Sequence, residues 1–528
     1  MSDVVRNYTG TGGSLRSGRR RRAGRGLFRK VVLPGVILVL LVFLWVTRDS
    51  YDVTECLPAG QGFSVVLSDP LNSLDRAGQS RLWEAVPAQW SQQVSAQNLA
   101  QRTGMPDWVV NNLFHDRLFL FGNDTHHFGD VVAITRMTRI GTLLERFHRI
   151  APGIDRDFAG GLELRKVAES RVYYAVRGRL LILSPSREAL IHSLTLAPGA
   201  TMGEDALSDL TQSGTEDIRG AFTVSPEHPL GTYVRRVAFA LRIDGESAHA
   251  KCRAELNPEW KAAYGPLFAK AHPVPLGTPP PGMVEISANF GIPVAELWPA
   301  LGTVYSSEWM TREQWEVWAN PSADGTLKVS QFITGLLADR GPGIRLALTG
   351  IDTNEMLPMP LLVGTFDGNV SGLPALFKAI PAPPETAMAW DSYPRYDEAL
   401  GMVRVPCIGG PSMEPCAAVY GNALLASTSR NAAEQVLASA PPSGNLPQEG
   451  NLYVRVRPLA LAESIVEAGR LFVAFDGLRG YSPESYETAA TEWLACAGAV
   501  EEVTAMASVQ GQNLDVDFRI RSMPRPKQ

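Results

Sequence analysis

The side chains best suited to chemistry lie in one short stretch, HDRLFLFGNDTHHFGD, which ends at Asp130. Imidazole and carboxylate groups together suit zinc or another divalent ion, so His115, Asp124, His126 and Asp130 are candidate metal ligands. Their spacing matches no fixed motif such as HExxH, and a polar loop between two strands explains the same residues. Both interpretations stay open, and the sequence predicts no resident cofactor.

The five cysteines carry a second kind of chemistry. Cys407 and Cys416 flank the turn-rich segment IGGPSMEP, which can bring two strands opposite one another. In an oxidising compartment such a pair can close as a disulfide, and the alternative is two unpaired thiols. Cys56, Cys252 and Cys496 are an odd remainder, so at least one of the three is free or intermolecular. The sequence contains no CxxC, nucleophile elbow, phosphate-binding loop or zincin motif, and therefore no catalytic residue is predicted.

One phrase of the sequence occurs twice. AVRGRLLILSPSREALIHSLTLAP begins at Ala175, AVYGNALLASTSRNAAEQVLASAP begins at Ala418, and 11 of the 24 positions are identical. Each copy reads as an apolar strand, a tight turn at a shared glycine, a second strand and a short helix. Ser184 and Ser427 are the predicted helix N-caps.

Both copies of the phrase keep an arginine, Arg187 or Arg430, in the first turn of the predicted helix. A cation there is opposed by the positive end of the helix dipole, so an offsetting contact is expected. One interpretation is structural, with each arginine lying over the sheet and pairing with a nearby carboxylate. The other is that the two arginines hold an anionic group of a partner.

The segments around the phrase repeat in the same order, while the spacing between copies drifts from 230 to 243 to 266 residues. A period of this length indicates duplication of a whole domain. Residues 57–256 and 283–522 are the two predicted copies, joined by a helix and a proline-rich linker over residues 257–282. Because strands arrive in hairpins with helices between them, the predicted fold is α+β, with two tandem domains and mainly antiparallel sheets.

The N-terminus combines a basic segment with an apolar run. Residues 1–26 are predicted to form a disordered cytoplasmic tail, and residues 27–47 are about the ~20 residues needed to cross a bilayer. A cleaved signal peptide or a lipoprotein at Cys56 are the alternatives, but the small residues that such sites need are missing. The expected arrangement is a single-pass signal anchor in the inner membrane, with the N-terminus cytoplasmic and the bulk of the chain periplasmic.

Composition excludes two broad classes of protein. Hydrophobic content of 45% with 20% charged residues over 528 residues is ordinary for folded chains and excludes general disorder. The formal net charge is −5, although nine of the 49 basic residues lie within the first 30 positions. The remaining chain is acidic, which argues against a nucleic-acid partner.

A resemblance points in the same direction. The single apolar run, the stretch TECLPAGQGFSVVLSD and the phrase YGNALLASTSRNAAEQVL together resemble bacterial membrane-anchored proteins of unknown function. Those proteins carry large extracytoplasmic α+β domains. The resemblance implies a location and a domain type, and it implies no activity.

Three classes of function follow from the sequence. The leading hypothesis is a non-enzymatic envelope protein, integral to the cytoplasmic membrane, that binds or organises an envelope protein or lipid partner. This hypothesis is favoured because no catalytic acid, base or nucleophile recurs in the two copies. The alternatives are an envelope hydrolase or metal-dependent enzyme using the region from His115 to Asp130, and a carrier of lipid or lipoprotein.

Overall fold

The structure is a computed structural model of the 528-residue chain. The residues that it describes are 43–44, 47–49, 51–85, 106–123, 128–148, 154–159, 161–167, 172–197, 199–202, 216–228, 230–268, 274–294, 296, 335–337, 339–353, 358–380, 382, 385, 388, 394–406, 410–439, 445–475 and 477–524.

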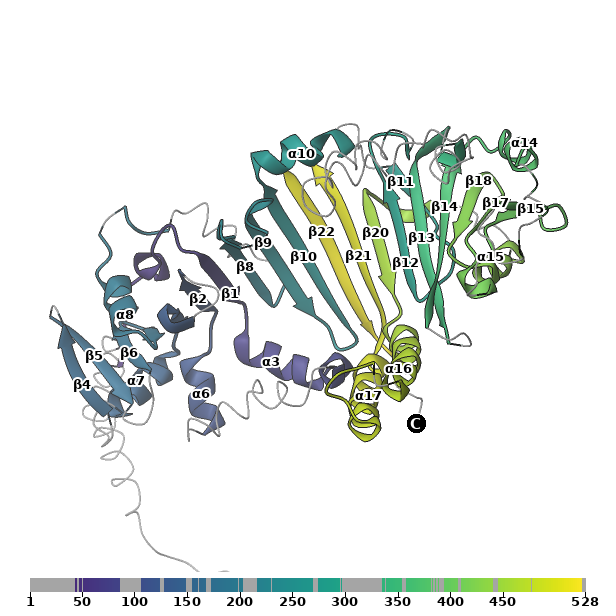
Figure 1. Ribbon diagram of the computed structural model, residues 1–528. Helices are drawn as coiled ribbons and strands as arrows, with labels where there is room; N and C mark the ends of the chain where they lie inside the picture. Colours follow the sequence, from purple (N-terminus) through teal and green to yellow (C-terminus); the bar gives the residue numbers. More distant parts are fainter. Residues whose placement is uncertain are drawn as a thin grey trace, which may run out of the picture.

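Twenty strands of the described residues form one antiparallel sheet (Figure 1). Across the sheet the order is β4-β5-β6-β7-β3-β2-β1-β8-β9-β10-β22-β21-β20-β12-β13-β14-β18-β17-β16-β15. The strands of the first half are β1 Phe63–Leu67, β2 Leu118–Gly122, β3 Val132–Arg136, β4 Ile154–Ala159, β5 Leu162–Val167, β6 Tyr173–Arg177, β7 Leu180–Ser184, β8 Ile218–Thr223, β9 Val234–Ile243 and β10 Ser247–Leu256. Those of the second half are β12 Val284–Asn289, β13 Arg340–Asp352, β14 Met359–Gly368, β15 Arg395–Asp397, β16 Met402–Arg404, β17 Cys416–Tyr420, β18 Ala423–Ser427, β20 Leu452–Val456, β21 Val500–Gln510 and β22 Asn513–Ser522.

The two halves of the chain repeat the same order of strands. From β1 outward, each strand of the first half has a counterpart from β12 outward, and the last strands of the halves, β10 and β22, pair with each other. A second, two-stranded sheet consists of β11 (Val274–Gly277) and β19 (Asn445–Gly450). The proline-rich segment predicted as a linker thus contributes a strand.

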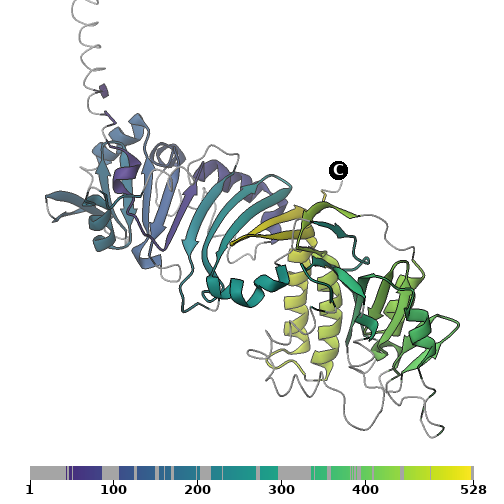
Figure 2. The ribbon, with the colours of Figure 1, turned by 90° about the horizontal axis from the view of Figure 1, so that it is seen from above.

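Helices lie along the sheet and at the ends of its strands (Figures 1 and 2). The α-helices are α3 Pro70–Gln79, α6 Asp107–Leu113, α7 Arg139–His148, α8 Arg187–Leu194, α10 Pro258–Phe268, α14 Leu373–Lys378, α15 Arg430–Leu437, α16 Pro458–Ala474 and α17 Pro483–Gly498. The short 3₁₀ helices are η2 Val53–Cys56, η3 Arg81–Ala85, η4 Phe128–Asp130 and η5 Pro411–Met413.

The repeated phrase folds as its pattern predicts. It forms β6, β7 and α8 in the first copy, and β17, β18 and α15 in the second. Gly178 and Gly421 occupy the two tight turns with φ of +57° and +60°, a region that side chains with a Cβ disfavour. In each copy the second strand of the hairpin is almost fully buried, because its apolar residues pack beneath the helix.

The copies differ in the connection that precedes their last hairpin. In the first copy, residues 224–233 join β8 to β9. In the second copy, the helical hairpin of α16 and α17 joins β20 to β21. This hairpin, called the helical hairpin below, explains much of the drift in spacing between the copies.

The predicted fold class is wrong in its division into two tandem domains. The pairing of β10 with β22 joins the sheets of both copies into one, so a single antiparallel sheet runs through both copies. Hydrophobic periodicity identifies both strands, but it cannot show which free edges meet when they lie hundreds of residues apart.

The prediction of an N-terminal transmembrane helix is also corrected. No helix among the described residues is long and apolar enough to cross a membrane. Of residues 27–47, only Phe43, Leu44 and Thr47 belong to the described part of the chain. The predicted helix over residues 27–47 includes Pro34 and Gly35, two residues that disfavour helix interiors. The single-pass signal anchor, the inner-membrane location and the periplasmic placement depended on that helix and are withdrawn with it.

Candidate binding surface

The two candidate metal ligands that the structure describes, His115 and Asp130, do not lie in one site. His115 precedes β2 and is exposed, whereas Asp130 precedes β3. Because Leu118 pairs with Thr135 and Phe121 with Val132, the two residues lie at opposite ends of this hairpin, on the order of 15 Å apart. Zinc–ligand bonds are about 2 Å long, so His115 and Asp130 cannot bind the same ion.

The other two candidates, Asp124 and His126, lie outside the described residues. Among the described residues there is no group of three or more His, Cys, Asp or Glu side chains that could hold a metal ion. Asp130 has a local structural contact instead, since its Oδ2 accepts a hydrogen bond from the backbone N–H of Asn123 at 3.0 Å. That bond closes the turn between β2 and β3.

The helix caps of the repeated phrase lie two residues later than predicted. Ser186 caps α8 by accepting from the N–H of Ala189 at 3.2 Å, and Ser429 caps α15 in the same way. Ser184 and Ser427 end the preceding strands, and each hydroxyl accepts from the N–H of the true cap residue. Each copy has two serines that could cap the helix, and the sequence alone does not show which of them is the N-cap.

Arg187 is the first residue of α8 and is held by a carboxylate of the protein. Its Nε donates to Asp157 Oδ2 at 2.6 Å, from the outer strand β4. This hydrogen bond lowers the pKa of Asp157 and raises the pKa of Arg187. The negative charge offsets the unfavourable position of a cation at a helix N-terminus.

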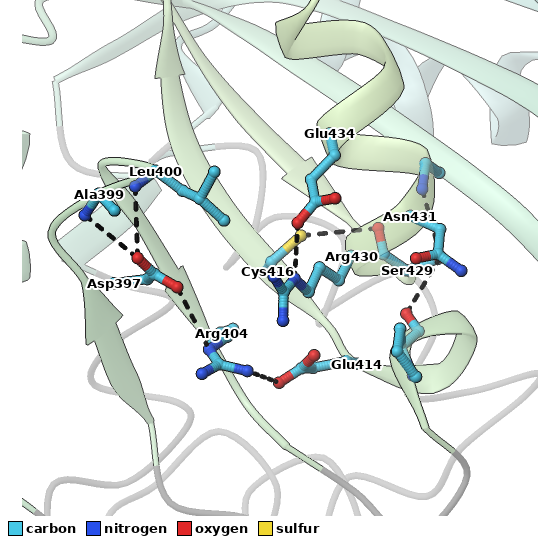
Figure 3. A network of polar contacts seen from close by, with 12 residues as sticks. Asp397, Ala399, Leu400, Arg404, Glu414, Cys416, Ser429, Arg430, Asn431 and Glu434 are labelled. Atoms are coloured by element: carbon cyan, nitrogen blue, oxygen red, sulfur yellow. Dashed lines mark hydrogen bonds and ion pairs between the residues drawn. The ribbon is translucent and has the colours of Figure 1, made fainter.

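Arg430 lies in a related network in the second copy (Figure 3). Its Nε donates to Glu434 Oε1 at 2.6 Å, and this hydrogen bond raises the pKa of Arg430 even though burial opposes the shift. Asp397 of β15 occupies the place of Asp157, accepts from the N–H of Ala399 and lies 3.9 Å from Arg404. The guanidinium groups of Arg187 and Arg430 both have carboxylate partners within the chain, which favours the structural interpretation of these arginines.

Cys416 lies buried beside the same network (Figure 3). Its Sγ donates to the carbonyl of Ser429 at 3.6 Å. Burial, with the negative charges of Glu414 and Glu434, raises the pKa of Cys416 to about 12. Cys407 lies outside the described residues, so the disulfide between them stays a prediction.

The central strands present one strongly polar face. On it His249 pairs with Asp517 at 2.9 Å, Arg253 pairs with Asp515 at 2.6 Å, and Arg519 pairs with Asp517 at 3.0 Å. A shallow cavity of about 630 Å³ lies over this face between β8 and β21. Two of these pairs, His249–Asp517 and Arg253–Asp515, cross the join between the two copies.

In the middle of the same strands, the opposite face carries apolar side chains and the thiol of Cys252, while Ser522 and Arg340 lie on it at the strand ends. Because cross-strand partners share a face, the registers assign it residue by residue from β9 to β13. Its members are Val237, Phe239, Leu241, Ile243, Ala248, Ala250, Cys252, Ala254, Leu514, Val516, Phe518, Ile520, Val503, Ala505, Ala507, Val509, Leu452, Val454, Val456, Val284, Ile286, Ala288, Ile344, Leu346 and Leu348. This set is called the apolar face below.

The apolar face is not buried. All of its residues except Ala254 are partly or fully exposed, and Leu346 retains 40% of its accessible surface. Figure 1 shows α10 across one end of these strands and the helical hairpin at the other end. Apolar area of this extent is rare on the surface of a monomer and marks an interaction site.

Burial is reversed across β12. On its polar face, Glu285 and Ser287 are only 3% and 1% exposed, and Glu285 accepts from Arg455 at 2.6 Å. On the apolar face, the neighbouring Val284 and Ile286 stay partly exposed. The hydrophobic effect favours the opposite arrangement, because burying charge is costly and burying aliphatic side chains is favourable. β12 therefore buries a charged residue while its aliphatic residues stay partly exposed.

A row of small side chains runs along the apolar face over β10, and this row is called the furrow below. Every residue of β10 on this face between Ala248 and Ala254 is alanine or Cys252. Larger residues flank it on both sides: Val237, Phe239, Leu241 and Ile243 of β9, and Leu514, Val516, Phe518 and Ile520 of β22. Burial raises the pKa of Cys252, as an apolar environment does. The furrow is about 20 Å long, and the backbones of its walls are about 10 Å apart.

Sequence reasoning found these strands but missed this surface. The alternation of VAFALRI and AHAKCRAE predicts strands with one apolar face, and such a face usually belongs to a core. The signal available in the sequence was the run of small residues at alternate positions of β10, Ala248, Ala250, Cys252 and Ala254, next to a strand of large ones.

Known proteins resemble this chain only remotely. No protein family and no curated protein matches the sequence. Among solved structures, crystal form III of TP0453 is 8% identical over 40% of this chain and 81% of that chain, with a TM-score of 0.25. Crystal form IV of TP0453 is 11% identical over 42% of this chain and 87% of that chain, with a TM-score of 0.25. Similarity at this level indicates neither a shared fold nor a shared function.

Proposed function

We propose that this protein is a non-enzymatic binding protein that holds the apolar chain of a lipid in the furrow over β10. The observation that carries the proposal is the reversed burial of the central sheet, where Glu285 is buried and Ile286, the next residue, is partly exposed. A hydrocarbon chain lying on the apolar face would remove that face from water and restore the usual balance.

The dimensions of the furrow favour a hydrocarbon chain. Once the side chains of the two walls are counted, a gap of about 10 Å between backbones leaves room for roughly one polymethylene chain. The length of about 20 Å exceeds the depth of one bilayer leaflet, which is about 15 Å. One acyl chain of ordinary length therefore fits along β10.

The chemistry of the furrow also favours a ligand without polar groups. Apart from the Cys252 thiol, the apolar face offers no side chain that donates or accepts hydrogen bonds. An extended peptide on this face would leave backbone N–H and C=O groups without partners, at a cost of a few kcal/mol per group. A hydrocarbon chain has no such groups and loses no hydrogen bonds when it leaves water for the furrow.

The proposal is tested by filling the furrow. Ala250→Trp places an indole on its floor, whereas Ala240→Trp places the same group on the polar face of the neighbouring strand, opposite Lys251. Binding of a fluorescent fatty acid to the full-length protein is measured by titration. Ala250→Trp should weaken binding about tenfold or more, and Ala240→Trp should leave it unchanged. Equal affinities for both variants, or no binding by the unmodified protein, would contradict the proposal.

A further inference from the structure

The helical hairpin ends in a tip that exposes large apolar side chains. Phe475, at the end of α16, keeps 70% of its surface accessible, and Phe472 and Tyr481 are also exposed. Figure 2 shows the two helices extending away from the sheet, so the tip lies at their far end. Isolated exposed apolar residues are ordinary, but three aromatic rings at one protruding tip are not.

Loose packing does not explain this exposure. Tyr486 of α17 is buried, and its hydroxyl donates to the carbonyl of Val466 at 3.1 Å. Gly469 lies against the ring of Tyr486, where a Cβ would overlap with the hydroxyl. Arg470 and Glu487 join the helices through two hydrogen bonds of 2.7 and 2.9 Å. The helical hairpin is therefore a well-packed unit that presents its aromatic tip outward.

We infer that the tip of the helical hairpin inserts into the interfacial region of a lipid bilayer. Aromatic rings are favoured at that depth, because they bury an apolar body near polar headgroups. A protein partner is less suitable, since a stable protein interface buries about 1,200–2,000 Å² and a convex turn between two helices offers far less. The inference deepens the proposed function, because the bilayer would then be the source of the acyl chain.

The charge of the tip makes the inference specific. Between Phe472 and Tyr481 the sequence has one acidic residue, Asp476, and one basic residue, Arg479. The net charge of the tip is thus zero, and electrostatic attraction to anionic headgroups supplies little. Docking should therefore proceed as well on zwitterionic vesicles as on anionic ones.

The test places a probe at the tip of the full-length chain. An environment-sensitive fluorophore is attached at Phe475→Cys, or at Phe158→Cys as the control, after the five native cysteines are replaced by alanine. Phe158 is the matched position because it is a phenylalanine of β4 with 68% of its surface exposed. Vesicles of phosphatidylcholine, with or without phosphatidylglycerol, are then added.

We expect the emission at position 475 to shift to the blue, and lipids with brominated acyl chains to quench it, equally on both kinds of vesicle. Position 158 should respond to neither. An unchanged spectrum at 475, an equal response at 158, or a response at 475 on anionic vesicles alone would overturn the inference. If the cysteine-free chain does not fold, hydrogen exchange on the unmodified chain replaces the probe, and vesicles should then protect the amides of residues 471–481.

A second variant separates this inference from the proposed function. Ala250→Trp fills the furrow but leaves the helical hairpin untouched, so docking at position 475 should persist in that variant. Loss of docking in Ala250→Trp would mean that the sheet contacts the bilayer, and it would overturn the role of the tip. Docking without any fatty-acid binding would leave the tip established and the furrow refuted.

Discussion

Lys251 of β10 lies directly opposite Asp517 of β22, and each residue holds the same position in its own copy of the duplicated unit. Both follow the turn glycine of their hairpin, Gly245 or Gly511, at the same distance. The last strand of one copy therefore pairs with the last strand of the other around a local two-fold axis. This arrangement widens the apolar face, because the apolar sides of both copies become continuous. One side of the furrow over β10 is formed by β22 of the other copy.

Reversing the charge at the axis should destabilise the join between the copies. Lys251→Glu places a carboxylate directly opposite Asp517, and like charges on facing strands cost about 0.2–1 kcal/mol. Lys251→Gln is the control, since it removes the cation without adding repulsion. The urea midpoint should be highest for the unmodified protein, lower for Lys251→Gln and lowest for Lys251→Glu. Equal midpoints for the two variants would contradict the register.

The ion pair between Arg187 and Asp157 should make a pH-dependent contribution to stability. The pKa of Asp157 is lowered in the folded state, so its contribution is present above the ordinary pKa of an aspartate and is lost as the pH falls through the lowered value. Arg187→Met should therefore be less stable than the unmodified protein at neutral pH, and the difference should shrink in acid.

A double-mutant cycle isolates that pair. Arg187→Met, Asp157→Asn and the double variant are compared by urea unfolding from neutral pH down to about pH 3. A coupling free energy that is present at neutral pH and disappears in acid is the expected result. A coupling of zero at every pH would show that the hydrogen bond at 2.6 Å contributes nothing to stability.

The close approach of α16 and α17 should depend on Gly469. Gly469→Ala puts a methyl group where the Tyr486 hydroxyl lies, so the helices must separate and the bond to Val466 is lost. Overpacking of this kind costs about 1–3 kcal/mol. Removing the hydroxyl first, with Tyr486→Phe, should make the alanine substitution less costly in thermal unfolding. If Gly469→Ala lowers the stability equally with Tyr486 and with Phe at position 486, the added methyl group does not clash with the hydroxyl.

Thiol labelling decides the state of Cys416. As a buried free thiol with a pKa of about 12, it should react only after the protein is unfolded. Unfolding without a reductant should then expose all five thiols to labelling. Loss of the labels at Cys407 and Cys416 in peptide mapping by mass spectrometry, restored by a reductant, would show instead that these two residues form a disulfide.

The sequence predicted local units of this fold well. The repeated phrase specifies β6, β7 and α8 because its glycine, its alternation and its short apolar helix are all encoded within 24 residues. The pairing of β10 with β22 was not predictable in the same way. Each strand ends its copy with a free edge, and no residue of either strand specifies which edge it will meet.

The candidate surface was hidden for a different reason. Alternation in β9 and β10 shows that one face is apolar, but exposure depends on which elements cover that face, and helices placed at the strand ends are not encoded in the strands themselves. Closeness in sequence is also a poor guide to closeness in space, since His115 and Asp130, two of the candidate metal ligands, lie at opposite ends of a hairpin.

The most direct test of the binding proposal uses the thiol that the furrow already contains. Cys252 lies on its floor and is partly exposed, and Cys496 of α17 is partly exposed outside it. The rate of maleimide labelling at each cysteine is measured on the full-length protein by mass spectrometry, with and without a saturating fatty acid. We expect the acid to slow labelling at Cys252 about tenfold or more and to leave Cys496 unchanged. Labelling of Cys252 at an unchanged rate while the acid is bound would contradict the account.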